Sequence, residues 1–186
     1  MQFRYTIIIL SVFINIFISC KNGEQSDQDK ILKNIAETYG DKLGNYKFIV
    51  HLPIDWTRKD TTVQGLKVTL IQKKKEDDNF APNINILDEF IGNRDPVDYV
   101  KSSKKYLVDN MPGIKILENG EIDSANVKGI WYSYSKFKNG KTRDLTMYCV
   151  VLNGVAFNFT CAVNQGGLIK YRPIFEQIVE SIKIEN

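Results

Sequence analysis

The chain has 186 residues, of which 43% are hydrophobic and 25% charged, a composition typical of one globular domain with a short appendage. Its formal net charge is only +3 at pH 7, with basic and acidic residues interspersed. A charge this small and dispersed gives no reason to expect nucleic acid as a partner.

Residues 1–19 carry one positive charge, at Arg4, followed by an apolar run from Tyr5 to Ile18. A charged start and a short apolar stretch are typical of a secretory signal peptide. A membrane-spanning helix needs about 20 predominantly apolar residues, and this run is shorter and interrupted by polar side chains. We therefore predict a signal peptide over residues 1–19, with a retained membrane anchor as the alternative.

The segment Phe17-Ile18-Ser19-Cys20 resembles the lipobox of bacterial lipoproteins, although Phe17 stands where leucine is usual. The resemblance implies that Cys20 carries a diacylglyceryl group on its sulfur and becomes the mature N-terminus. Each buried CH₂ of an acyl chain contributes about 0.8 kcal/mol, so several chains anchor a protein stably to a membrane. Residues 21–29 contain no large apolar side chain, so we predict that residues 20–29 form a lipidated cysteine and a flexible tether.

We expect the folded domain to span residues 30–186, beginning with a helix and three strands. Apolar residues at helical spacing predict a helix over residues 31–39 (Ile31, Leu32, Ile35, Ala36 and Tyr39). An alternating pattern predicts a strand over residues 46–52 that ends at Pro53. Further strands are expected at residues 65–72 and 82–90, joined by a charged loop.

The clearest helix signal begins at Asp95 and Pro96, which are typical of an N-cap and a first helical position, and Gly113 lies just beyond its end. Its expected buried stripe is Val97, Val100, Lys104 (by its stem), Leu107, Val108 and Met111.

The second half of the domain contains three Asn-Gly pairs, at 119–120, 139–140 and 153–154, each of which predicts a two-residue hairpin turn. The strands expected around them cover residues 114–118, 126–137, 142–152 and 155–163. Pro173 is read as the start of a final helix whose apolar stripe is Ile174, Phe175, Ile178, Val179 and Ile182. These elements predict an α+β domain with a largely antiparallel sheet flanked by helices.

The turn at 153–154 fixes a register in which Cys149 pairs with Asn158 and Cys161 with Thr146. The two cysteines then lie on opposite faces of the sheet and apart along the strands. A disulfide requires Cα atoms within about 7 Å and converging side chains. We therefore predict two free thiols, although an oxidising compartment would permit a bond.

Several segments together resemble the PsbP-like family, which shares the Mog1/PsbP-type fold with DcrB-like bacterial proteins. They are YKFIVHLPIDW, the helix after Asp95-Pro96, VKGIWYSY, the hairpin at 153–154 and YRPIFEQIVESIKI, within residues 44–184. The resemblance implies an α/β/α sandwich and a non-enzymatic role. These segments are structural landmarks, so no functional residue is implied by them.

The residues themselves predict no catalytic, metal-binding or cofactor-binding site, and no cofactor is expected. The single histidine, His51, suits a structural or solvated position, because zinc sites need Cys and His in paired spacings. Residues 76–79, EDDN, lack the alternating acids and the glycine of a calcium loop. Glu176 and Glu180 lie one helical turn apart and are expected on a solvated face.

Two functions remain open from the sequence. The favoured one is a non-catalytic lipoprotein of the cell envelope, held to the membrane through Cys20, whose domain binds or stabilises another envelope protein or assembly. The alternative is a carrier of a small ligand, or a weak hydrolase, with a pocket between the sheet and the helices. Lys21 follows the cysteine instead of the aspartate that favours the inner membrane of enteric bacteria, so we expect the outer membrane of a Gram-negative cell, facing the periplasm.

Overall fold

The computed structural model describes residues 44–185 except 64, 76–79, 111–112, 125–126 and 139. The signal segment, Cys20, the helix expected at 31–39 and the acidic loop 76–79 lie outside the described residues. None of the helices that are described is long and apolar enough to cross a membrane.

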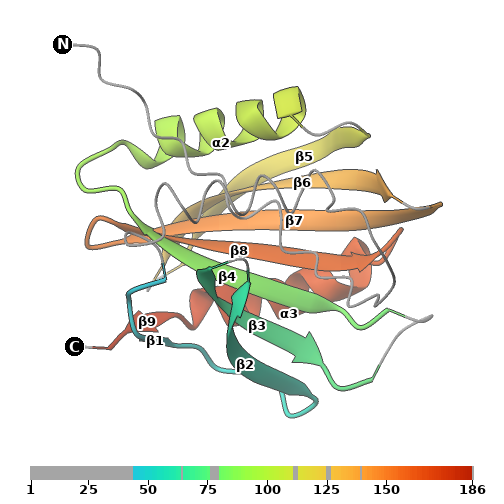
Figure 1. Cartoon of the computed structure of the whole chain (residues 1–186), viewed down its shortest axis with the longest axis horizontal. Coiled ribbons are helices and arrows are strands. Elements are labelled where there is room, and N and C mark those ends of the chain that lie inside the picture. The colour runs from blue at the N-terminus through green and yellow to red at the C-terminus, as the bar shows by residue number, and fades with distance from the viewer. Residues whose placement is uncertain are drawn as a thin grey trace.

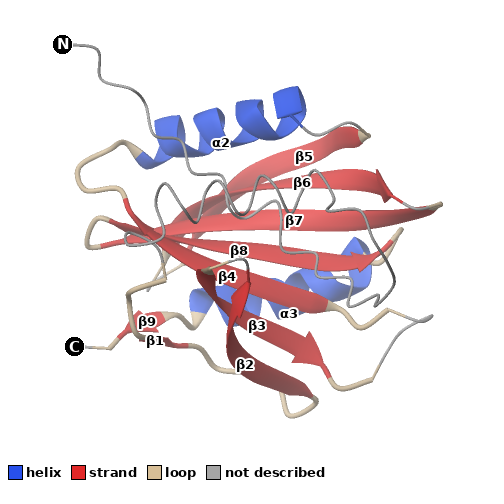
Figure 2. Ribbon diagram, in the orientation of Figure 1, coloured by secondary structure: helices blue, strands red, loops and turns tan. Residues whose placement is uncertain are grey.

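A seven-stranded antiparallel sheet dominates the described chain, in the order β2-β3-β4-β8-β7-β6-β5 (Figure 1). Its strands are β2 (Trp56–Val63), β3 (Leu66–Lys73), β4 (Asn83–Phe90), β5 (Ile114–Asp123), β6 (Lys128–Lys138), β7 (Lys141–Leu152) and β8 (Val155–Asn164). Two short strands, β1 (Phe48–Ile49) and β9 (Lys183–Ile184), pair separately. The helices are α2 (Pro96–Asn110) and α3 (Leu168–Glu180), and Figure 2 shows them against the sheet.

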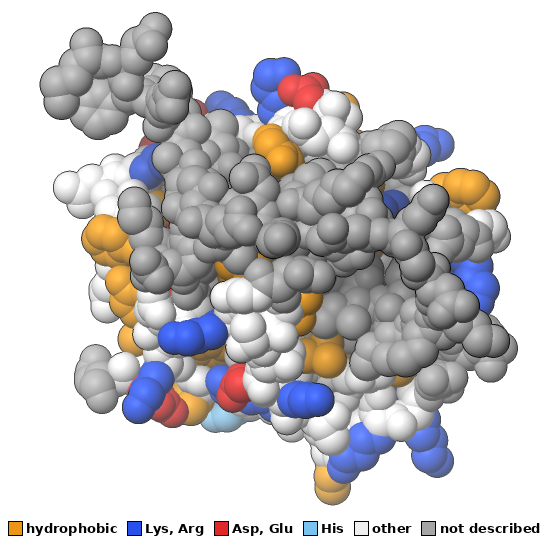
Figure 3. Space-filling model, viewed as in Figure 1, with side chains coloured by type: hydrophobic (Ala, Val, Ile, Leu, Met, Phe, Trp, Pro, Cys, Tyr) orange, Lys and Arg blue, Asp and Glu red, His pale blue; other side chains and the backbone are white. Residues whose placement is uncertain are grey.

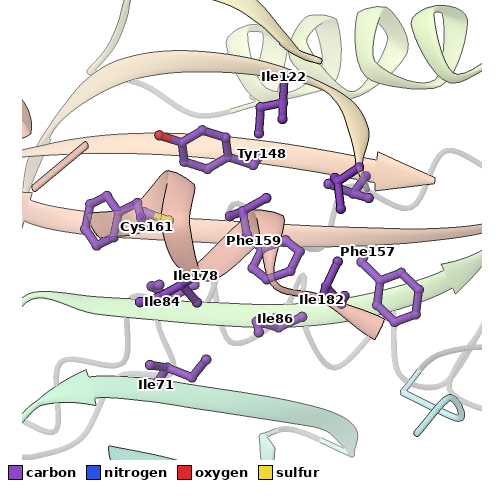
Figure 4. Packing of buried hydrophobic residues seen from close by; sticks show 14 of the residues in the cluster. Ile71, Ile84, Ile86, Ile122, Tyr148, Phe157, Phe159, Cys161, Ile178 and Ile182 are labelled. Carbon is purple, nitrogen blue, oxygen red and sulfur yellow. The ribbon is translucent and has the colours of Figure 1, made fainter. Parts of the chain in front are cut away.

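The two helices cover opposite faces of the sheet, so the expected α+β sandwich is confirmed. On one face Tyr99, Val100 and Leu107 of α2 pack in a cluster with alternate residues of the strands, among them Cys149. On the other face Phe175, Ile178 and Val179 of α3 pack with the remaining strand residues. Figure 4 shows part of this second cluster, including Ile71, Ile84, Ile86, Phe157, Phe159 and Cys161.

The predicted register of the central hairpin is confirmed. Asn153 and Gly154 have φ angles of 52° and 77°, as a type I′ turn requires. Cys149 pairs with Asn158 and Cys161 with Thr146. Both cysteines are buried and free, and they belong to the clusters on opposite faces.

The strands β6 and β7 also form a hairpin, with Lys138 paired to Lys141, as the second Asn-Gly pair predicted. The pair at 119–120 does not form a turn. Asn119 and Gly120 lie inside β5, which continues to Asp123, so this prediction is wrong. A Cβ atom on Gly120 would lie 2.7 Å from the Trp131 ring of β6. The glycine is needed because an indole packs directly over the backbone there.

The two helices differ from expectation in one boundary and in one buried stripe. The last helix begins at Leu168 instead of Pro173, because burial of Leu168 and Tyr171 extends it by more than a turn before the proline. The cap of α2 is as predicted, since the backbone N–H of Asp98 donates to Asp95 Oδ1 at 3.0 Å. Its predicted stripe is partly wrong. Val97 and Val108 are exposed, the buried residues are Tyr99, Val100, Ser103 and Leu107, and Met111 lies outside the described residues.

The predicted strand over residues 46–52 is much shorter in the structure, and strand β2 was missed. Only Phe48 and Ile49 form a strand, paired with β9. β2 follows immediately as an edge strand of the main sheet, with mostly exposed, polar side chains. A strand that buries so little has a weak hydrophobic alternation, which is why its sequence did not indicate it.

One carboxyl group is buried on the α2 face of the sheet. Glu89 of β4 is 7% exposed, and its Oε2 accepts a hydrogen bond of 2.8 Å from the hydroxyl of Tyr99. The side-chain amide of Asn158 in turn donates to the Tyr99 hydroxyl at 2.8 Å. Burial raises the pKa of Glu89 from 4.5 to about 7, although Tyr99 and the charge of Arg94 oppose the shift. The carboxyl group is therefore largely protonated in the fold below neutral pH.

Replacing Trp56 by alanine should lower the free energy of unfolding by about 3–5 kcal/mol, the usual cost of deleting a buried indole. Trp56 is 5% exposed and makes edge contacts with Tyr171 and Phe175 of α3. Urea unfolding measures the loss, and Ile54→Ala, at a 93% exposed position two residues away, is the control. An unchanged stability of Trp56→Ala would contradict the packing described.

The buried carboxyl predicts that stability falls as pH rises from about 4.5 to about 7, because the unfolded chain ionises Glu89 first. The full loss is about 3 kcal/mol at 1.36 kcal/mol per pKa unit. Glu89→Gln retains an oxygen to accept from Tyr99 and should remove this pH dependence, making the variant more stable than the parent at pH 8. Urea unfolding between pH 4 and 8 tests this, with the exposed Glu180→Gln as control. If the free energy of unfolding of Glu89→Gln depends on pH as strongly as that of the parent, Glu89 is not the cause of the pH dependence.

Candidate binding groove beside strand β2

A groove of about 710 Å³ opens on the α3 face of the sheet, at the turn end of the β2–β3 hairpin. It lies between the sheet, the segment Gly44–Phe48 that enters the domain, and the end of β9. Its lining from the sheet is Arg58, Asp60, Thr61, Thr62, Lys67, Val68, Thr69, Ile86 and Asp88. We call this feature the edge groove.

The edge groove exists because the side chains of β2 and β3 change character along the hairpin. At its open end Trp56 and Ile71 are apolar and pack in the cluster under α3. Toward the turn, the residues on the same face of the two strands are polar: Asp60, Thr62, Lys67 and Thr69. Polar side chains contribute little to a core, so this part of the sheet is left beside solvent and bounded by the entering segment.

The wall formed by β2 is held by interactions among its own charges. Arg58 Nε lies 3.1 Å from Asp60 Oδ1, and the hydroxyl of Thr69 donates to the same oxygen at 2.5 Å. The guanidinium of Arg58 also donates to the Phe48 carbonyl at 2.9 Å and lies 4.7 Å from the centre of the Phe48 ring. These contacts fix both Arg58 and Asp60 in place before any partner binds.

The opposite wall is the entering segment, which Asp88 of β4 ties to the sheet. Asp88 Oδ2 accepts the backbone N–H groups of Asn45 at 3.0 Å and Tyr46 at 3.2 Å. Burial raises the pKa of Asp88, and the two N–H donors and the charge of Lys67 act in the opposite direction. The ammonium group of Lys67 donates to the Asn45 side-chain oxygen at 3.3 Å. The groove is therefore bounded by a wall that hydrogen bonds hold in place.

Gly44 permits the close crossing at which this wall begins. It adopts a φ angle of 65°, and an added Cβ would lie 2.5 Å from the Cβ of Lys67. Any larger residue would push the entering segment away from β3.

The chemistry of the edge groove suits binding. Its lining contains carboxylates, cations and hydroxyls, but neither a histidine nor a cysteine. His51 lies elsewhere and is exposed, and its backbone N–H donates to Ser181 Oγ at 2.8 Å. Burial raises the pKa of the Cys149 thiol to about 12 and also raises that of Cys161, so neither is a thiolate at neutral pH. In the described ranges no cluster of His, Cys, Asp and Glu could hold a metal ion.

The sequence had not singled out the residues of the edge groove. Glu176 and Glu180, which it had considered, lie on α3 half-buried and exposed, respectively. The available signal was the β-branched content of the run, with Thr57, Thr61, Thr62 and Val63, which suits an edge strand. It was overlooked because β2 itself was not predicted.

Searches of protein families and of curated proteins found no match. Solved structures do match. LpqN of Mycobacterium tuberculosis, described as involved in cell envelope biogenesis, is 18% identical with a TM-score of 0.58, over 77% of this chain and 86% of LpqN.

Two further structures have the same arrangement. Cyanobacterial PsbP of Synechocystis is 12% identical with a TM-score of 0.54, over 77% of this chain and 93% of that protein. The Ran-binding protein Mog1p of Saccharomyces cerevisiae is 6% identical with a TM-score of 0.50, over 75% of this chain and 95% of Mog1p. The sandwich with one helix on each face of an antiparallel sheet, together with these matches, identifies the fold of this chain as the PsbP/Mog1 type.

Proposed function

We propose that this protein is a non-catalytic, lipid-anchored component of the cell envelope whose domain binds another envelope protein through the edge groove. The observation that carries the proposal is a groove of about 710 Å³ whose charged walls are fixed by internal hydrogen bonds and which runs beside an exposed edge strand. Such a site is organised in advance for polar recognition, and preorganisation lowers the entropic cost of binding.

The fold supports a binding role by analogy alone. LpqN is described as involved in cell envelope biogenesis and Mog1p as Ran-binding, and both are more than 80% covered by the match to this chain. Neither partner is carried over to this protein. The common element is the sandwich fold.

The proposed location follows from the first 29 residues. Cleavage before Cys20 and lipidation of its sulfur would leave residues 21–29 as a tether, whose reach at roughly 3.5 Å per residue is a few tens of ångströms. Lys21 after the cysteine favours the outer membrane of a Gram-negative cell, with the domain in the periplasm. Nucleic acid is not a proposed partner, and the basic side chains visible in Figure 3 lie apart instead of forming one patch.

A small polar ligand is the second candidate, because the volume of the edge groove lies within the range of small-molecule sites. The edge groove is not the pocket that the small-ligand alternative predicted, which would lie between the sheet and the helices. Its walls are the sheet and the entering segment, and they carry several charged side chains beside apolar ones, whereas most small-molecule pockets are lined mainly by apolar and aromatic side chains with few polar groups. These differences favour the protein partner.

Cys20→Ser should abolish lipid attachment and leave an uncleaved or mislocalised precursor, because serine cannot form the thioether. Metabolic labelling with an alkyne analogue of palmitate should mark the parent chain and not the variant. Cys149→Ser, at a buried thiol, is the control and should keep the label. Undiminished labelling of Cys20→Ser would contradict the lipoprotein assignment.

The partner site is tested by photo-crosslinking in cells that make the full chain. A benzophenone side chain at Thr62, in the edge groove, should give a discrete protein adduct. The same group at Lys105, exposed on α2 at the opposite face, should give none. Adducts of equal yield at both positions, or no protein adduct at Thr62, would contradict binding through the edge groove.

A further inference from the structure

Strand β2 forms an unpaired edge of the main sheet with uninterrupted geometry. All eight of its residues pair with β3, from Trp56 opposite Lys73 to Val63 opposite Leu66, without a bulge. Among the described residues no other strand pairs with β2. Arg58, Lys59, Asp60 and Thr62 are all exposed. An edge of this kind presents backbone donors and acceptors to which another strand can be added.

The hydrogen bonds at the open end of the hairpin show which backbone groups of β2 face outward. The N–H of Lys74 donates to the carbonyl of Asp55 at 2.7 Å, so Asp55 faces β3. The N–H of Trp56 instead donates to Pro53 at 3.0 Å. Because backbone groups alternate in direction along an antiparallel strand, Thr57, Lys59 and Thr61 face β3.

The N–H and C=O groups of Arg58, Asp60 and Thr62 therefore face away from the sheet. Within the described chain none of these backbone groups hydrogen bonds to another segment. Their side chains line the edge groove. A strand added here would thus form up to six backbone hydrogen bonds and would place alternate side chains over the groove.

The other edge of the sheet is less suited to strand addition. The register of β5 against β6 shifts between Ile116 and Glu118, which marks a bulge at Leu117. Bulges bend and twist an edge strand and are one way in which proteins prevent edge-to-edge pairing. Among the described residues, the main sheet therefore has one regular edge, and it adjoins the edge groove.

The occupant that fits this edge is a polar extended segment of a different protein. Side chains over the edge groove would lie beside Arg58, Asp60 and Thr62, and those on the other face beside Lys59 and Thr61, so an apolar strand would gain little. Pairing of β2 with a second copy of itself would oppose like charges in two registers, Lys59 with Lys59 or Asp60 with Asp60, and it is the other outcome of the test below.

We infer that a partner protein binds by adding an extended, polar segment to β2, with alternate side chains seated in the edge groove. The inference deepens the proposed function and rests on it. The backbone groups of Arg58, Asp60 and Thr62 would bind the backbone of the partner segment, and the edge groove would select the side chains of that segment.

The test uses the full chain purified in detergent and, as its probe, a phage-displayed library of linear twelve-residue peptides. Thr62→Pro removes one outward N–H, and the ring blocks the edge, whereas Thr62→Ala removes the side chain but retains the N–H. Selected peptides should bind Thr62→Pro at least tenfold more weakly than Thr62→Ala, because the two variants lose the same side chain and only the proline also loses the N–H. The melting temperature of each variant verifies that the fold is intact.

Amide hydrogen exchange of the parent chain tests the same inference without a variant. A bound peptide should slow exchange at Arg58, Asp60 and Thr62, while Thr57, Lys59 and Thr61 are already slow in the free chain. Peptides that leave the three amides unprotected, equal binding by a folded Thr62→Pro variant, or a library without binders would overturn strand addition. Protection that grows with protein concentration and needs no peptide would assign the edge to a second copy and overturn the partner proposed. The crosslinking result at Thr62 stands separately, since a partner can occupy the edge groove without pairing with β2.

Discussion

The structure depends on the burial of both faces of β7 and β8. These two strands form the centre of the sheet, and consecutive residues along them point alternately to the α2 cluster and to the α3 cluster. A strand buried on both faces requires a cover on each side, and a shift by one residue would exchange the two sets of side chains. The type I′ turn at Asn153 and Gly154 sets this register. One turn therefore determines which side chains meet each helix.

The same constraint explains why Cys149 and Cys161 are separate free thiols. Each is an apolar member of a different cluster, and the sheet lies between them. Small exported domains often need disulfides to be stable. This domain has two buried clusters with large aromatic side chains, among them Tyr99, Phe157 and Phe175. Core packing can then stabilise the fold in an oxidising compartment without a covalent link.

Strong local signals in the sequence predicted the centre of the fold well. The hairpin at 153–154, the capped start of α2 and the apolar stripe of α3 each follow from turn chemistry or periodicity, and the structure has all three. Errors arose where tertiary contacts decide. Gly120 is required because the indole of Trp131 packs over it, and it does not form a turn. Packing of Leu168 and Tyr171 makes α3 begin before the proline that was expected to start it.

The edge groove could not be predicted from the sequence for a related reason. An edge strand such as β2 buries few side chains, so its residues are selected for exposure and carry no strong hydrophobic alternation. Arg58, Asp60 and Thr62 line a groove only because β3, β4 and the entering segment surround them in the fold. A polar binding surface on a sheet edge is thus hard to predict from one sequence, because the features that make it accessible also remove the pattern by which strands are recognised.

Asp88 links the edge groove to the segment that enters the domain, through which the proposed tether would act. By accepting two backbone N–H groups it fixes residues 45 and 46 against β4, and these residues lead back along the sequence to Cys20. A pull on the N-terminal segment would act first on this wall of the edge groove, and then on Phe48, which packs with Phe157 in the cluster under α3. Because the carboxyl group holds the segment to the sheet by two hydrogen bonds, it would protect the shape of the groove from motion of the proposed tether. In a lipid-anchored protein of the kind proposed, such a clamp would keep recognition independent of where the membrane lies.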